Sequence, residues 1–205
     1  FEEALKTIHL WGADDLYAIR FSGGEPTLYP RLGELVEAAK AVGVEKIAIS
    51  TNGSASLEQY KKLLDAGVND FSISLDACCD NDFGTMSGGV QAAFDKVIDN
   101  VSKLTILTYV TVGVVLTDQN ANQLNDIIQF VHGLGVDDIR IIPAAQNGDR
   151  LAQIQVDPTM LEMHPILKYR VNNIQTGRPV RGLCLRDSNR FGFVLDDMAV
   201  YGGNH

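Results

Sequence analysis

The chain has 205 residues with 45% hydrophobic content, which is enough for one globular domain with a sizeable core. Its 17 basic and 26 acidic residues give a formal charge of −9, which disfavours binding to the phosphate backbone of a nucleic acid. No apolar run approaches the roughly 18 residues of a membrane helix, and three cysteines make no disulfide framework, so we predict a cytoplasmic protein without membrane contact.

Helical and strand-like patterns alternate from the first residue to Pro143. Helices are expected over residues 1–11, 30–41, 57–66, 90–104 and 122–134, where apolar residues recur at helical spacing. Short apolar strands are expected over residues 17–22, 46–50, 71–75, 106–116 and 138–142. This alternation implies βαβ crossovers and therefore a parallel sheet.

Polar and glycine-containing segments follow these strands. In parallel α/β folds the chemistry gathers at the carboxyl ends of the strands, so these segments are the candidate site. They are Gly23-Gly24-Glu25-Pro26, Ser50-Thr51-Asn52-Gly53, Ser74 with Asp76, residues 117–120, and Pro143. Loops of this kind are polar in any fold, and that alone explains part of the pattern.

The pattern changes after Gln146. Asp157 and Pro158 form a cap and first-turn pair for one helix that runs to about residue 175, and residues 177–179 break it. Residues 191–201 resemble a strand or hairpin. We therefore expect a core domain over residues 1–176 and a small β extension over residues 177–205.

Gly23 and Gly24 leave the backbone bare just after a buried strand, so that polar atoms of a ligand can approach it closely. Glu25 adds a carboxylate, and Pro26 stiffens the segment. Several acceptors at short range suit an ammonium group.

The segment from Ser22 to Leu28 resembles the GGEP segment of radical S-adenosylmethionine (SAM) enzymes, and the order of the later strand ends is similar to that family. The resemblance implies that Gly23, Gly24 and Glu25 hold the amino group of SAM. It assigns the ribose and carboxylate to the next two strand ends, with Ser50, Thr51, Asn52, Ser74 and Asp76. It assigns the adenine to the later strands, with Asn120, Ile142 and Pro143.

The same resemblance implies a partial (β/α)6 TIM-like barrel with mostly parallel strands, without its first strand and cluster loop. It implies an enzyme that cleaves SAM reductively at a 4Fe–4S cluster and abstracts hydrogen from a substrate through a 5′-deoxyadenosyl radical. The expected partners are a small-molecule, peptide or nucleotide substrate and an electron donor such as flavodoxin or ferredoxin.

The C-x-x-x-C-x-x-C run that binds the cluster in this family does not occur in the sequence. We expect it upstream of Phe1, so the fragment alone is predicted to be inactive. Cys78 and Cys79 are adjacent and are interpreted as idle thiols, whereas Cys184 is a candidate ligand of an auxiliary cluster. The four histidines show no metal-ligand spacing.

Two other functions stay open at this point. One is an α/β-barrel enzyme of another class that uses glycine-rich loops to bind phosphate. The other is a non-catalytic binding domain that kept the fold and lost the cluster. Individual residues also have simpler roles, since Asn52-Gly53 suits a turn and Ser74, Asp76 and Asn120 suit local caps.

Overall fold

The computed structural model describes residues 1–75, 91–117, 120–144, 153–178, 183–185 and 195–200, the last two segments in their backbone alone. Within these residues, no helix is both long and apolar enough to cross a membrane.

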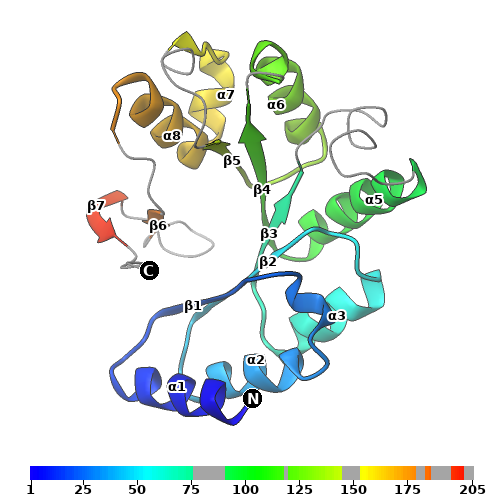
Figure 1. Cartoon of the computed structure of the whole chain (residues 1–205), viewed down its shortest axis with the longest axis vertical. Helices are drawn as coiled ribbons and strands as arrows, with labels where there is room; N and C mark the ends of the chain where they lie inside the picture. Colours follow the sequence, from blue (N-terminus) through cyan, green and yellow to red (C-terminus); the bar gives the residue numbers. More distant parts are fainter. Residues whose placement is uncertain (76–90, 118–119, 145–152, 179–182, 186–194, 201–205) are drawn as a thin grey trace.

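A five-stranded, entirely parallel sheet forms the centre of the molecule, with its strands in the order of the sequence (Figure 1). The strands are β1 (Ala18–Phe21), β2 (Lys46–Thr51), β3 (Asp70–Ser74), β4 (Tyr109–Leu116) and β5 (Asp138–Pro143). The predicted parallel α/β fold is therefore confirmed. A sequential strand order is the order of a barrel, and the five strands form an open, curved part of one rather than a closed barrel.

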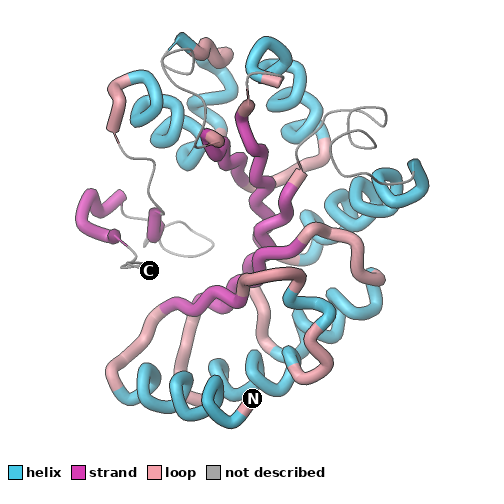
Figure 2. The backbone as a smooth tube through the Cα atoms, viewed as in Figure 1, coloured by secondary structure: helices cyan, strands magenta, loops and turns pink. Residues whose placement is uncertain are grey.

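Helices connect the strands and follow one side of the curved sheet (Figures 1 and 2). They are α1 (Glu2–Ala13), η1 (Pro26–Leu28), α2 (Leu32–Ala41), α3 (Leu57–Ala66), α5 (Gln91–Leu107), η2 (Ala121–Gln123) and α6 (Leu124–Gly133). The strand predicted from residue 106 begins later, at Tyr109, because the helical hydrogen bonds continue as far as Thr108 N to Leu104 O at 3.0 Å.

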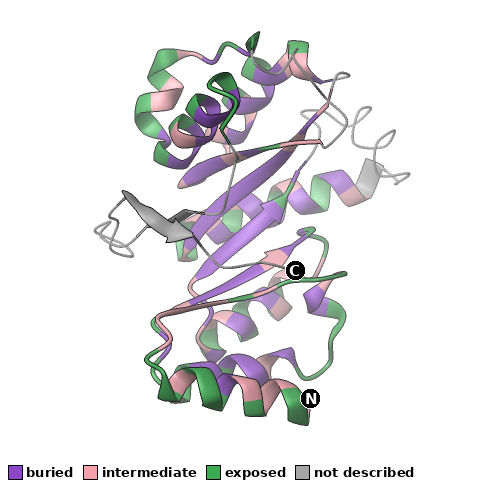
Figure 3. Cartoon of the chain, turned by 60° about the vertical axis from the view of Figure 1, so that its left-hand side comes forward, coloured by how far each residue is buried: buried purple, intermediate pink, exposed green. Residues whose placement is uncertain are grey.

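Alternate residues of each strand form the core on the helix-covered side of the sheet. Ile47 and Ile49 of β2, Phe71 and Ile73 of β3 and Val112 of β4 are fully buried there. The strands are buried across the middle of the molecule, and the helices expose only their outer faces (Figure 3). Burial of this apolar face stabilises the sheet and leaves its other face available for polar side chains.

The prediction of one helix after Asp157 is wrong, because the segment forms two helices, α7 (Pro158–Met163) and α8 (Pro165–Gln175). Pro165 has no N–H to continue α7, and His164 before it adopts φ −124° and ψ 89°. The predicted cap is confirmed, since Asp157 accepts a hydrogen bond from Thr159 N at 2.8 Å.

One strand, β7 (Leu195–Val200), lies within the range 191–201, where a strand or hairpin was predicted. It pairs antiparallel with β6 (Leu183–Leu185), a strand that was not predicted and that contains Cys184. The boundary of a separate unit near residue 177 stays a prediction.

Asp138 lies at the amino end of β5 and anchors α8. Its buried carboxylate accepts hydrogen bonds from Ile166 N at 2.9 Å, Leu167 N at 3.3 Å and Ile139 N at 2.7 Å. Desolvation nevertheless outweighs these bonds and raises the pKa of Asp138 to about 6.

A pair of histidines lies next to this carboxylate. The histidines show no spacing pattern in the sequence, so this pair was not predicted. His132 Nδ1 and His164 Nε2 are 3.0 Å apart, and His164 Nδ1 is 3.9 Å from Asp138. Burial and the neighbouring His132 lower the pKa of His164, so a neutral imidazole faces Asp138 near neutral pH.

Replacing Asp138 with asparagine is expected to flatten the pH dependence of stability. Because the fold raises the pKa of Asp138 from 3.8 to about 6, the native state binds more protons than the unfolded chain between these values. The stability of the wild type therefore falls as pH rises from about 4 to about 6, by roughly 2–3 kcal/mol from this group. Urea unfolding at a series of pH values measures this difference.

The exposed Asp65 is the matched control, because Asp65→Asn removes a carboxylate that the described structure does not bury. Asp65→Asn should retain the wild-type pH profile. An unchanged profile in Asp138→Asn would contradict the assignment.

Candidate functional site

Gly23 and Gly24 form a bare turn directly after β1. Their φ angles are 105° and 53°, which side chains of L residues rarely adopt. A Cβ added at either position would meet no atom of the described residues within 4 Å. The glycines are therefore required by the backbone conformation and not by packing. The space above this glycine cradle (Gly23 and Gly24) is open to a ligand.

The carboxylate of Glu25 joins the ends of β1 and β2. Its Oε1 accepts hydrogen bonds from Thr27 N at 3.1 Å, Thr27 Oγ1 at 2.7 Å and Thr51 Oγ1 at 2.7 Å. Its Oε2 accepts one from Asn52 N at 2.7 Å. Burial works to raise the pKa of Glu25, but these bonds outweigh it and the pKa is lowered, so the group is ionised at neutral pH.

We call this arrangement of Glu25 with Thr27, Thr51 and Asn52 the Glu25 bridge. It fixes the glycine cradle relative to the end of β2. A carboxylate has about four acceptor sites, two on each oxygen. Since Oε2 accepts a single bond from the described residues, it keeps capacity for one further donor, such as an ammonium group.

The loop after β2 is held by buried partners. Thr51 Oγ1 is 3.1 Å from the hydroxyl of Tyr60, and Asn100 Nδ2 donates to Gly53 O at 2.8 Å and to Ala55 O at 2.9 Å. Asn52 has the turn role that we left open, because its Oδ1 accepts from Ser54 N at 2.9 Å and Ser54 Oγ at 2.7 Å.

The remaining predicted residues lie on the strands β2, β3 and β5 of the sheet. Ser50 and Ser74 are on the strands β2 and β3, and exposed Ser74 pairs with Gly113 of β4. Ile142 and Pro143 end β5, and Ile142 is 37% exposed. A Cβ added at Gly113 would make ordinary contacts with β5, at 3.5 Å from Arg140 Nη2 and 3.6 Å from Ile142 Cδ1.

Asn120 follows β4, and its side chain bonds to the end of that strand. Its side chain accepts from Thr117 N at 2.8 Å and donates to Val115 O at 2.8 Å, and it makes no cap bond to the following helix. Asp76, Cys78 and Cys79 lie outside the described residues, as does the side chain of Cys184. Their predicted roles stay predictions.

Sequence reasoning missed two of the groups that position the site. Asn100 and Tyr60 are distant in sequence from the candidate motifs and hold the loop after β2. Asn100 had a detectable signal in the sequence, because it lies three residues after Val97 and four before Leu104, on the apolar side of the predicted helix. In the structure it is 2% exposed. Buried polar side chains of this kind need partners, and here the partners are two loop carbonyls.

Known proteins and a protein-family model are similar to this chain. Residues 1–131 match the family model of the Radical SAM superfamily. A probable GTP 3′,8-cyclase of Sulfurisphaera tokodaii is 28% identical over 160 residues, which is 77% of this chain and 50% of that protein. One of Saccharolobus solfataricus is 32% identical over 127 residues, which is 61% of this chain and 41% of that protein. The chain thus spans half or less of the length of these relatives.

Solved structures share the fold at low sequence identity. Streptococcus suis SuiB bound to SAM superposes with a TM-score of 0.59 and 17% identity over 85% of this chain and 40% of SuiB. Coproporphyrinogen III oxidase (HemN) of Escherichia coli superposes with a TM-score of 0.54 and 13% identity over 89% of this chain and 47% of that enzyme. Because the family model covers well over half of the sequence, the chain belongs to the radical SAM superfamily, whose members are enzymes that use SAM and a 4Fe–4S cluster.

Proposed function

We propose that the carboxyl ends of the strands bind SAM and that the intact protein is a radical SAM enzyme. The observation that carries this proposal is the open glycine cradle, held next to an ionised carboxylate by the Glu25 bridge. The cradle gives bare backbone, and Glu25 Oε2 gives a charged acceptor, so the residues present fit an amino-acid ammonium group.

Each proposed residue has a limited task. Gly23 and Gly24 admit the ligand to the backbone, and Glu25 attracts its ammonium group. The peptide groups of Ser50, Thr51 and Asn52 at the end of β2 orient the polar groups next to it, the Thr51 hydroxyl holds Glu25, and Ser74 adds a hydroxyl at the adjoining strand end. Ile142 and Pro143 offer an apolar surface at the end of β5, which suits a base and excludes water.

When bound with its cluster, SAM supplies a carbon radical that removes a hydrogen atom from a substrate. Placement and the exclusion of water are the contribution of this chain. The names of the relatives make a nucleotide one candidate substrate, and the SuiB structure with its precursor peptide makes a peptide another. Cys184 as an auxiliary-cluster ligand, Asp76 and Asn120 as SAM contacts, and flavodoxin or ferredoxin as electron donor stay proposals.

Reconstitution of the intact protein without oxygen tests this function directly. We expect it to bind iron and sulfide, and to release methionine and 5′-deoxyadenosine from SAM after reduction. Iron analysis and chromatography of the products measure both outcomes. An intact protein that stays free of iron under these conditions would refute the proposal.

A pair of glycine variants tests the cradle itself. Gly23→Ala and Gly43→Ala place the same methyl group at positive φ, 105° and 92°, and neither methyl group meets an atom within 4 Å. Both variants should lose a similar small amount of stability, of about 1–2 kcal/mol. Gly23→Ala alone should weaken SAM binding, by about tenfold or more, in calorimetry on the reconstituted protein. Equal SAM affinities in the two variants would place the SAM site elsewhere.

A further inference from the structure

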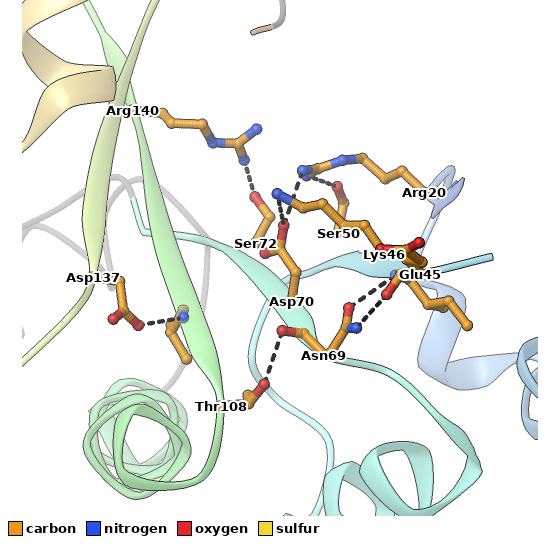
Figure 4. A network of polar contacts seen from close by, with 12 residues as sticks. Arg20, Glu45, Lys46, Ser50, Asn69, Asp70, Ser72, Thr108, Asp137 and Arg140 are labelled. Atoms are coloured by element: carbon orange, nitrogen blue, oxygen red, sulfur yellow. Dashed lines mark hydrogen bonds and ion pairs between the residues drawn. The ribbon is translucent and has the colours of Figure 1, made fainter. Parts of the chain in front are cut away.

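The face of the sheet that is turned away from the core carries a cluster of charged side chains (Figure 4). They come from strands far apart in the sequence: Arg20 of β1, Lys46 of β2, Asp70 of β3 and Arg140 of β5. Ser50 and Ser72 lie among them and are direct neighbours in the register of β2 and β3. We call this group the inner-face cluster.

At the amino ends of β2 and β3, the cluster contains a buried carboxylate that forms ion pairs. Asp70 is 1% exposed, and its Oδ2 lies 3.3 Å from Lys46 Nζ and 3.7 Å from Arg20 Nη2. Lys46 also lies 5.5 Å from the centre of the Tyr109 ring. Among the described residues, Asp70 is the carboxylate that ion-pairs on this face. It balances one of the neighbouring cations.

Nearer the carboxyl ends of the strands, around Ser50 and Ser72, the cluster keeps excess positive charge. Arg20 Nη1 donates to Ser50 Oγ at 3.2 Å, and the guanidinium of Arg140 donates to Ser72 Oγ. Both acceptors are neutral hydroxyls. The Nε of Arg140 is buried without a hydrogen-bond partner among the described residues. Burial first, and then the charges of Arg20 and Arg170, lower the pKa of Arg140 to about 10, while the charges of Asp70 and Tyr109 act to raise it.

Arg20 is exposed and shares Asp70 with Lys46, whereas Arg140 is buried beside a neutral hydroxyl and would gain from an anion next to it. Two guanidinium groups have planar forks of donors that match the oxygens of a phosphate or carboxylate group. The protein as a whole is strongly acidic, with a formal charge of −9, so a concentration of cations on this face is a local feature. A purely structural ion network would place a carboxylate opposite the buried Arg140, and among the described residues no ion pair of Arg140 is present.

From these contacts we infer that Arg20 and Arg140 bind an anionic group of the substrate, a phosphate or a carboxylate, with the hydroxyls of Ser50 and Ser72 beside it. Asp70 pairs with Lys46 and Arg20, so the cation that it leaves without an ion pair on this face is Arg140, and the anion would lie on the side of Arg20 that faces Arg140. This inference rests on the proposed function, because it takes the inner face to be the substrate side of the enzyme.

The position of the cluster suits a substrate and not SAM. Arg20 and Ser72 precede the strand-end residues Ser22 and Ser74 by two positions each, which corresponds to about 7 Å along a strand. An anion held there would extend its molecule toward the strand ends, where the proposed SAM residues lie. The two binding sites would be adjacent along the strands and separable by mutation.

Calorimetry on the intact, reconstituted protein with pyrophosphate and with citrate as probes tests the inference. We expect at least one probe to bind, with an affinity that falls as salt increases. Arg20→Gln should lower that affinity at least tenfold. Its side chain is exposed, so the variant should fold. Arg140→Lys, which keeps the charge and loses the planar fork, should lower the affinity by a smaller factor. A preference for pyrophosphate would identify a phosphate-bearing substrate, and a preference for citrate a carboxylate.

The control is Arg31→Gln, which removes an exposed arginine that pairs with Glu34 on the helix side and should leave anion binding unchanged. If neither probe binds, or if Arg20→Gln binds as the wild type does, the inference is refuted. SAM binding is measured in the same samples. Loss of the anion in Arg20→Gln with SAM binding retained supports the inference, whereas anion binding in a protein that never binds SAM would refute the proposed function and leave the anion site standing.

Discussion

Replacing Glu25 with alanine is expected to destabilise the protein by about 2–4 kcal/mol and to abolish tight SAM binding. The change removes the acceptor of four hydrogen bonds, two from backbone N–H groups and two from hydroxyls. Leaving partly buried donors without an acceptor costs about 1–3 kcal/mol for a group, and bonds to a charged acceptor are among the stronger ones. Urea unfolding and calorimetry with SAM measure the two effects.

The Glu25 bridge gives this carboxylate a role in the fold as well as in the proposed SAM site. Two further variants separate its structural role from a charge effect. Glu25→Gln removes the charge and keeps one oxygen acceptor, whereas Thr51→Val removes one donor of the bridge and keeps the charge. If the charge of Glu25 attracts the ammonium group, SAM affinity falls much further in Glu25→Gln than in Thr51→Val at comparable stability. If affinity only follows stability in both variants, the carboxylate acts through the bridge alone.

The bridge also has a defined acid sensitivity. Burial tends to raise the pKa of Glu25, but the bonds from Asn52, Thr27 and Thr51 lower it below its ordinary value. The stabilisation is therefore present above the pKa of the unfolded chain and is lost as the pH falls through the lower folded value. Thr51→Val should reduce this loss under acid conditions, because it removes one of the bonds that hold the carboxylate ionised.

Gly53→Ala is expected to destabilise the protein by about 2–5 kcal/mol. Gly53 has φ 77°, so a side chain there is strained by about 1–2 kcal/mol. The added Cβ would also lie 2.9 Å from Val97 Cγ1 and 3.1 Å from Ile73 Cγ2, both in the packed core. Overpacking of this kind costs about 1–3 kcal/mol. Thermal or urea unfolding measures the sum.

Gly43→Ala is the matched control for this change. Gly43 has a similar φ of 92°, but a Cβ added there meets nothing within 4 Å. The difference between the two variants isolates the contact with Val97 and Ile73. Equal losses of stability would show that this contact relaxes without cost, and the close fit of α5 against the β2 loop would then be contradicted.

The alternation of helices and strands determined the fold class, because each unit depends on local apolar periodicity and on glycines that end helices. The positions of β2, β3 and β5 were predicted to within a residue or two for this reason. The glycine turn after β1 was equally visible, since positive φ at Gly23 and Gly24 is a demand of the local backbone. The end of α5 was placed too early. The apolar and β-branched residues from 106 onward predicted a strand, but Thr108 N still donates a helical hydrogen bond to Leu104 O.

The contacts between strand ends could only come from the tertiary structure. Glu25 and Thr51 are 26 residues apart and meet because β1 and β2 are neighbours in the sheet. Arg140 and Ser72 are 68 residues apart and approach one another across the inner face. The sequence by itself therefore determined which chemical groups stand at the end of each strand. The register and curvature of the sheet decided which of these groups share a charge, a hydrogen bond or a ligand, because those interactions depend on distances that no local pattern encodes.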